Sequence, residues 1–216
     1  MDFGFGLPWG ADCAVFGCSG WHEMLRRVES LYTHYGSARA LAEHLNREER
    51  FGRHGPFRFN DSRSDLRFYM TAGVGYYRLV ELAVPQAISQ WYFGSGGTVG
   101  FHTITGLAAL HDLILRREQK EIDFLVWPHE CDDPDSGTHL IVESYPAVFP
   151  LPTGARPYKE DENKEDAWKV LEWLMDADRK GELHRYFRIE PPPFGRIDGV
   201  DVAQQIRFEG WIIGVK

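Results

Sequence analysis

The sequence predicts an α/β domain in which helices pack on a sheet. Segments with apolar residues at helical spacing alternate with short apolar runs of strand length, and the linkers between them are short. The chain has 216 residues, of which 43% are hydrophobic, and this is enough for one good core. We therefore expect residues 1–216 to form a single domain.

The N-terminal part is predicted to start with a strand and to continue as helices. Residues 3–8 form the short apolar run FGFGLP, which is typical of a strand that runs into a turn. Helices are predicted within residues 19–50. Ser19 and Ser37 are the expected N-caps, because a serine hydroxyl accepts hydrogen bonds from the first free N–H groups of a helix.

The middle of the chain has a weaker pattern. Residues 52–66 are loop-like and residues 67–93 give no clear assignment, so we interpret residues 19–93 as a helical and loop insertion. Residues 93–103 contain four glycines and lack the spacing of a phosphate-binding loop, which favours a tight turn. Residues 103–118 are predicted to be an amphipathic helix.

The C-terminal part is predicted to contain two strands and two helices. The strands are residues 122–127 and 138–146, and a further helix and an apolar tail are expected in residues 197–216. Residues 165–183 are predicted to be a helix. The residues expected on its apolar face are Ala167, Trp168, Leu171, Leu174 and Met175.

The cysteine content favours free thiols. Three cysteines are few and odd in number, which does not favour a disulfide framework. Zinc is an alternative, with Cys13, Cys18, His22 and either His129 or Cys131 as ligands. Structural zinc sites usually show two closely spaced ligand pairs, so half-buried thiols are the favoured interpretation.

The sequence also predicts the cellular compartment. No apolar run approaches the roughly 18 residues needed to span a bilayer. The N-terminus lacks the basic region and apolar stretch of a signal peptide. We therefore expect a cytoplasmic protein with no membrane partner.

The charge is unevenly distributed. The net charge is −8, which argues against a dedicated non-specific nucleic-acid binder. Residues 47–67, however, hold six arginines against four acidic residues. Arg58, Arg63 and Arg67 are the candidate contacts to nucleic-acid phosphates in this segment. The alternative is a solvated helix end and loop.

Four acidic residues lie at the ends of apolar segments. Asp2 precedes the first predicted strand, Glu143 follows LIV at the end of another, and Asp198 and Asp201 open the last helix. A carboxylate beside the core is costly unless it is paired or binds a cation, and Mg²⁺ prefers such oxygen ligands. The alternatives are that Asp198 caps the helix and that Glu143 pairs with an arginine.

The order of several segments resembles a prokaryotic family. These segments are DFGFGLPWG, SQWYFGSGGTVGFHTITGLAALHDL, FLVWP, LIVESYPAVF and DGVDVAQQIRFEGWIIGV. They are similar to the family called domain of unknown function 429, whose members are predicted ribonuclease H-like nucleases. The resemblance extends from residue 1 to about residue 215.

The resemblance implies a ribonuclease H-like fold, with a mixed central sheet flanked by helices. It implies that Asp2, Glu143 and Asp201 are catalytic, and that these three and Asp198 bind Mg²⁺ or Mn²⁺. The expected reaction is hydrolysis of a phosphodiester in nucleic acid, in which metal ions lower the pKa of the attacking water and neutralise the leaving oxygen.

The sequence departs from the family pattern at its start. The family begins with a β-hairpin whose first strand carries the leading aspartate, and this chain begins at what corresponds to a later strand. Two hypotheses therefore stand beside the nuclease. One is a non-catalytic ribonuclease H-like module that binds nucleic acid or a protein partner. In the other, the carboxylates are paired with arginines and the protein acts on an unrelated small ligand.

Overall fold

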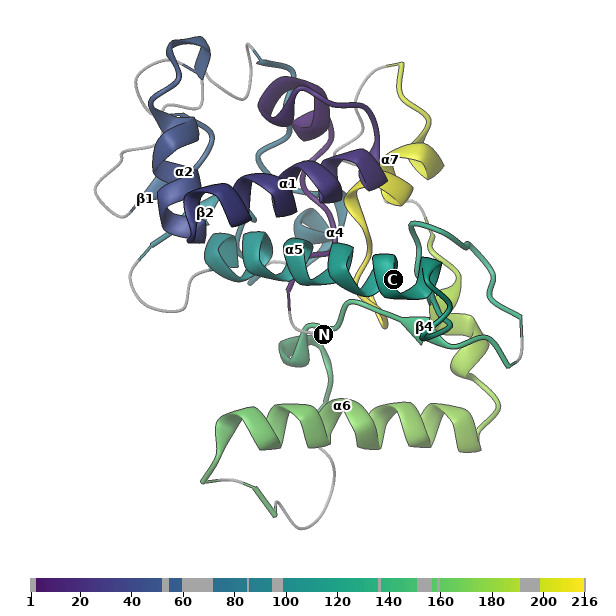
Figure 1. The fold of residues 1–216 in the computed structure, drawn as a ribbon. Coiled ribbons are helices and arrows are strands. Elements are labelled where there is room, and N and C mark those ends of the chain that lie inside the picture. The colour runs from purple at the N-terminus through teal and green to yellow at the C-terminus, as the bar shows by residue number, and fades with distance from the viewer. Residues whose placement is uncertain are drawn as a thin grey trace.

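The computed structural model describes residues 3–51, 55–59, 72–84, 86–94, 99–135, 137–150, 157–158, 160–190 and 199–215. Its α-helices in these ranges are α1 (Trp21–Tyr35), α2 (Ala38–Asn46), α4 (Leu79–Ala83), α5 (Val99–Glu118), α6 (Glu162–Arg179) and α7 (Val202–Glu209). The strands are β1 (Arg58–Phe59), β2 (Tyr92–Phe93), β3 (Leu125–Val126) and β4 (Leu140–Ile141). The fold is mixed α/β and is dominated by helices (Figure 1).

The two helices predicted within residues 19–50 are confirmed. The buried residues of α1 are Trp21, Met24, Leu25 and Val28, which lie on one face of a helix. The N-cap of α2 is Ser37, as expected, because its hydroxyl accepts a hydrogen bond from Ala40 N at 3.1 Å. The predicted cap at Ser19 is wrong, since α1 begins after Gly20.

The long helix α5 lies beside α1, and the two helices together form one layer (Figure 1). It starts at Val99, four residues before the predicted start, and so includes the end of the glycine-rich segment. Gly106 lies in its middle because the ring of Phe3 occupies the space that a Cβ atom would need. The N-terminal segment therefore rests directly on α5.

The strands are shorter and more scattered than predicted. In the described residues they form two separate two-stranded parallel sheets, β1–β2 and β3–β4, instead of one central sheet. Leu125 pairs with Leu140 and Val126 with Ile141, so the two predicted C-terminal strands are confirmed in place but not in length. The helices, more than the sheets, hold the layers together.

Residues 3–9 cross the centre of the molecule without joining a described sheet. Phe5 and Leu7 are fully buried, as expected for the predicted strand, although no strand forms. Gly6 is required because the backbone carbonyls of Phe208 and Glu209 lie where its Cβ atom would be. The N-terminal segment thus lies against the C-terminal end of α7.

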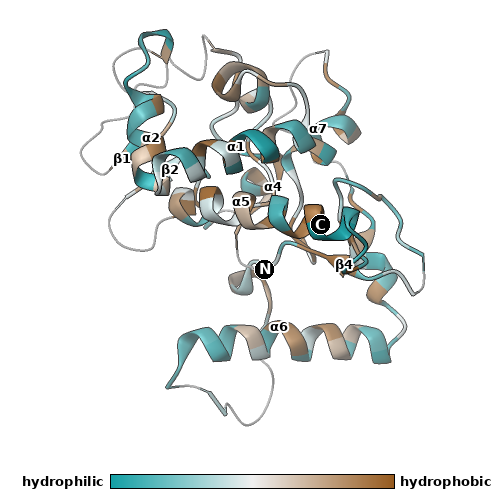
Figure 2. Cartoon of the chain, viewed as in Figure 1, coloured by the Kyte–Doolittle hydropathy of each residue, from teal (hydrophilic) through white to brown (hydrophobic). Residues whose placement is uncertain are grey.

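The core divides into two apolar clusters. The larger is formed mainly by α1, α2, α5 and the N-terminal segment, and the smaller by α4, the C-terminal tail and parts of α6. Figure 2 shows both hydrophilic and apolar residues on α1 and on α5, which lies below α1 in this view. None of the described helices combines the length and apolar character needed to cross a membrane.

The orientation of α6 differs from the prediction. Val170, Trp173 and Leu174 pack against the smaller cluster, and Ala177 is buried. Leu171 and Met175, which the sequence places on the apolar face, are exposed. The helix carries apolar residues on more than one side, so the pattern alone did not identify the side that packs.

Candidate functional site

Glu143 lies just beyond β4, where that strand meets the C-terminal tail. It forms a parallel bridge with Ile212, and its carbonyl oxygen accepts a hydrogen bond from Ile213 N at 3.0 Å. The residue is only 4% exposed. The sequence therefore correctly identified a carboxylate at the buried end of a strand, and the backbone pairing explains why its side chain is directed away from water.

The partner of this carboxylate is Arg78, which precedes α4. Arg78 Nη2 donates to Glu143 Oε1 at 2.6 Å and Nη1 donates to Oε2 at 2.8 Å. This is a bidentate pair, the strongest common geometry between an arginine and a carboxylate. Phe5 N also donates to Oε2 at 3.1 Å. The interpretation in which Glu143 pairs with an arginine is thus the one that the structure supports.

Two further glutamates surround the same guanidinium. Arg78 Nε donates to Glu81 Oε1 at 2.8 Å, and Nη1 donates to the carbonyl oxygen of Glu209 at 3.0 Å. Arg78 is 1% exposed. Burial opposes its charge, but the carboxylates of Glu143 and Glu81 outweigh that effect and raise the pKa of Arg78 above its ordinary value. We call Arg78, Glu81, Glu143 and Glu209 the Arg78 cluster.

Both carboxylate oxygens of Glu209 bind backbone N–H groups. Its Oε1 accepts from Trp9 N at 2.8 Å, and its Oε2 accepts from Leu79 N at 2.6 Å. Gln205 Nε2 donates to Oε1 at 2.9 Å. Burial raises the pKa of Glu209 to about 7 in spite of these donors. This one side chain therefore connects the N-terminal segment, α4 and α7.

Gln90 extends the network toward α5. Its Nε2 donates to Glu81 Oε1 at 2.7 Å, and its Oε1 accepts from the hydroxyl of Thr103. Burial raises the pKa of Glu81, although Arg78 and Gln90 both oppose that shift. Gln90 and Thr103 are buried like the cluster itself. The hydrogen bonds fix the amide orientation, with its nitrogen toward Glu81.

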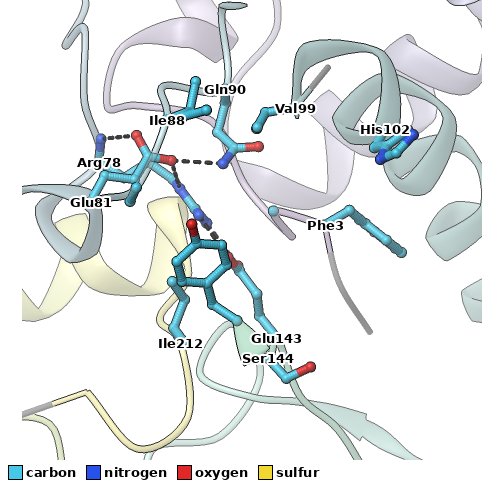
Figure 3. Close-up of a pocket in the computed structure, with 13 residues that line it drawn as sticks. Phe3, Arg78, Glu81, Ile88, Gln90, Val99, His102, Glu143, Ser144 and Ile212 are labelled. Atoms are coloured by element: carbon cyan, nitrogen blue, oxygen red, sulfur yellow. Dashed lines mark hydrogen bonds and ion pairs between the residues drawn. The ribbon is translucent and has the colours of Figure 1, made fainter. Parts of the chain in front are cut away.

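A pocket of about 240 Å³ opens over this network. Arg78, Glu81, Gln90 and Glu143 form one side of its wall, and Figure 3 shows Gln90 pointing toward the Arg78–Glu81 pair. The pocket is also lined by His102, Ser144 and Tyr145. The remaining wall is largely apolar. Its apolar residues include Phe3, Ile88, Val99 and Ile212. Small-ligand sites have this composition, with an apolar body and a few convergent polar groups.

Of the other predicted acidic ligands, Asp201 is in the described part of the chain, and it does not lie at this pocket. Asp2 and Asp198 lie outside the described residues. Asp201 is exposed and precedes α7, whereas the cluster contacts the other end of that helix at Glu209. At about 1.5 Å per residue, these two ends are about 12 Å apart. Asp201 does not line the pocket.

The described residues around Glu143 do not fit a divalent cation. Both carboxylate oxygens of Glu143 accept hydrogen bonds from Arg78, which would have to be displaced. Within the described part of the chain, no three histidine, cysteine or acidic side chains are grouped so that they could hold a metal ion. All five candidate zinc ligands lie in this part of the chain, so they do not form a site either.

Within the described ranges, the predicted nucleic-acid contact Arg58 and the thiols do not form a second site. Arg63 and Arg67 lie outside the described residues. Arg58 is half-buried on β1, and its guanidinium lies 4.9 Å from the centre of the Tyr76 ring. Burial raises the pKa of Cys18 to about 11, and so this thiol is protonated near neutral pH. It is poorly suited to act as a nucleophile.

Four residues of this network were not predicted from the sequence, namely Arg78, Glu81, Gln90 and Glu209. One signal was present, because Arg78 and Glu81 are three residues apart at the start of an apolar stretch and so meet on one helical face. The Arg78–Glu143 pair joins positions 65 residues apart. No local spacing could have indicated that pair.

Comparisons of the chain with protein-family models, with curated proteins and with solved structures gave no match. The resemblance to domain of unknown function 429 and the ribonuclease H-like fold therefore stay predictions. The pocket and the buried charges beside it are therefore the features that indicate a function.

Proposed function

We propose that this protein binds a small planar ligand with a hydrogen-bonding edge in the pocket beside the Arg78 cluster. The observation that carries the proposal is the position of the buried ion pair. Charged groups out of water are costly, and here they form the wall of a cavity instead of being surrounded by protein on all sides. Such groups are candidates for a ligand site.

The charge of the wall restricts the class of ligand. Arg78 supplies one positive charge, which Glu143 and Glu81 already match. A phosphate or carboxylate would therefore meet carboxyl groups whose arginine is already paired, which disfavours an anionic ligand. The wall is suited to a neutral or cationic ligand.

The hydrogen-bonding capacity of the wall restricts the ligand further. Among the described residues, Gln90 Nε2 donates one of its two N–H bonds to Glu81, and the second has no acceptor. Glu143 Oε1 accepts one hydrogen bond, from Arg78 Nη2, and retains a lone pair. A heterocycle that carries an amino group and a ring nitrogen would satisfy both groups, and the apolar wall would cover its faces. Nucleobases belong to this class.

A binding panel tests the proposal. The protein is titrated with the free bases and their nucleosides while its thermal unfolding is followed, and we expect at least one to raise the midpoint. Gln90→Met should abolish that shift. The matched control is Gln204→Met on the exposed side of α7, which should bind as the unchanged protein does.

Two results would refute this proposal. One is a panel in which no compound shifts the midpoint at millimolar concentration. The other is unchanged binding by Gln90→Met. If Gln90→Met is poorly folded, Ile88→Lys replaces it, because Ile88 is 49% exposed at the pocket and tolerates a polar side chain. Single-stranded oligonucleotides in the same assay distinguish a free base from an unpaired base in a strand.

A second candidate is the metal-dependent nuclease implied by the family resemblance. Phe3, the residue after Asp2 in the chain, lines the same pocket as Glu143, and this favours keeping the candidate. Labelled DNA and RNA are incubated with the protein and Mg²⁺ or Mn²⁺. Cleavage that disappears in Glu143→Gln and persists in the exposed control Glu118→Gln would support a nuclease. Cleavage that is unchanged in Glu143→Gln would exclude this site.

A further inference from the structure

The outer face of α6 is apolar and has no partner in the described part of the chain. Leu171 is 54% exposed and Met175 is 47% exposed, and the two lie one helical turn apart. Ala167 is also exposed on this face, and Trp168 beside it is half-buried. The opposite face already packs on the protein through Trp173 and Ala177. The helix therefore has one buried and one free apolar face, and Figure 1 shows it at the edge of the molecule.

Charges of opposite sign lie at the two ends of this free face. Lys164, Leu171 and Asp178 are spaced seven residues apart, so they lie along one line on the helix surface. All three are exposed. Lys164 is 2.9 Å from Asp161 in an exposed ion pair, and Asp178 makes no ion pair among the described residues. The line thus runs from a cation through an apolar centre to an anion.

We propose that this face binds the same face of a second copy of the chain, with the two helices antiparallel and Leu171 on the two-fold axis. In this arrangement Lys164 faces Asp178 of the second copy, and Ala167 faces its Met175. A two-fold axis repeats each contact, so one self-complementary face supplies both halves of the interface.

The charge pattern selects the antiparallel arrangement and a second copy as the partner. Parallel helices would place Lys164 against Lys164 and Asp178 against Asp178, and like charges in contact are unfavourable. The helical length from Lys164 to Asp178 is about 21 Å. A contact between two single helix faces of this length buries much less surface than the roughly 1,600 Å² of a stable interface. The dimer is therefore weak and forms in the micromolar range or above. No residue of α6 lines the pocket, so the dimer is independent of ligand binding.

Sedimentation equilibrium of the full chain, from low micromolar to millimolar concentration, tests the dimer. We expect a concentration-dependent monomer–dimer equilibrium that Leu171→Lys abolishes. Leu115→Lys on α5, where the leucine is 39% exposed outside this face, is the control and should leave the equilibrium unchanged. A monomer at every concentration, or a dimer that persists in Leu171→Lys, would overturn the proposal.

A charge exchange tests the antiparallel register. Lys164→Glu or Asp178→Lys alone should weaken the dimer about tenfold, because each change affects two symmetric ion pairs of modest strength. The double variant carries both changes and restores opposite charges across the axis, so it should dimerise like the unchanged protein. A double variant as weak as the single ones would overturn the register. Circular dichroism confirms that each variant keeps α6.

Discussion

The central side chains are buried both in the layer formed by α1 and α5 and in the Arg78 cluster. Those of the layer are apolar, whereas those of the cluster are charged. Leu25 and Leu107 are 0% exposed in the helical layer, and Arg78 is 1% exposed in the cluster. Apolar packing loses stability in proportion to the atoms removed. An ion cluster behaves differently, because removal of one member leaves the others buried and unpaired.

The largest expected effect is in the charged region. Arg78→Met removes the cation and leaves the carboxyl groups of Glu81, Glu143 and Glu209 without it. We expect a loss of about 3–5 kcal/mol in the free energy of unfolding, measured with urea. Arg207→Met is the control. It breaks an exposed pair with Asp132 and should cost less than about 1 kcal/mol.

A double variant tests whether this loss comes from the unpaired carboxylate. Arg78→Met combined with Glu143→Met replaces the ion pair by apolar groups, so it should be more stable than Arg78→Met alone. Equal losses for Arg78→Met and the Arg207→Met control would show that the two arginines contribute alike and would remove the distinction between buried and exposed pairs in this protein.

The next effect is in the apolar layer. Leu107→Ala removes fully buried methyl groups from α5 and should cost about 3 kcal/mol in unfolding free energy, because the surrounding helices close the cavity only in part. Leu115→Ala, on the exposed side of the same helix, should change it by less than about 0.5 kcal/mol. A similar loss for both leucines would contradict the assigned face of α5.

The third effect is a dependence of the unfolding free energy on pH, which we expect from the charged region and not from the apolar layer. Glu209 has a pKa of about 7 in the folded state against an ordinary value of 4.5, so the folded state holds this proton more tightly. Its contribution to stability is complete below pH 4.5 and is lost as the pH rises through 7. Relative to Glu209→Gln, the unchanged protein should lose on the order of 3 kcal/mol over this range.

Urea unfolding at several pH values between 4.5 and 7 measures this difference. Glu118→Gln at the exposed end of α5 serves as the control and should parallel the unchanged protein. Leu107→Ala should parallel it too, because this substitution removes no titrating group. A constant offset between Glu209→Gln and the unchanged protein would show that Glu209 does not titrate in this range.

The smallest effect concerns the helix caps of the apolar layer. Ser37→Ala removes the hydroxyl that accepts from Ala40 N and should cost about 1 kcal/mol. Ser19→Ala should have almost no effect, because no side chain caps α1. Thermal unfolding of both variants compares the two predicted caps directly. Equal losses would mean that the assignment of the caps is incorrect.

The helical layer could be predicted because its signals are local. Trp21, Met24 and Val28 repeat at helical spacing, and Ser37 stands where α2 begins. The face of α6 could not be predicted, since residues such as Trp173 and Leu171 make both sides apolar. Tertiary packing decides which side is covered.

The charged region could be predicted only in part. Glu143 was identified because a carboxylate after LIV is unusual at the end of a buried strand. Its pairing with Arg78 could not be read from the sequence, because residues 67–93 give no pattern and the contact is not local. The metal-ligand interpretation of Asp201 rested on its place at the start of an apolar helix and on a resemblance, whereas its exposed position before α7 follows from tertiary structure.

The Arg78 cluster also has a consequence for the order of folding. Its contacts join Arg78 to Glu143 and Glu209, which are 65 and 131 positions away, so long loops must close before they form. Contacts between α1 and α5, once made, bring these segments closer and shorten the remaining search. We expect the cluster to form after the rate-limiting barrier, with Arg78→Met accelerating unfolding more than it slows folding.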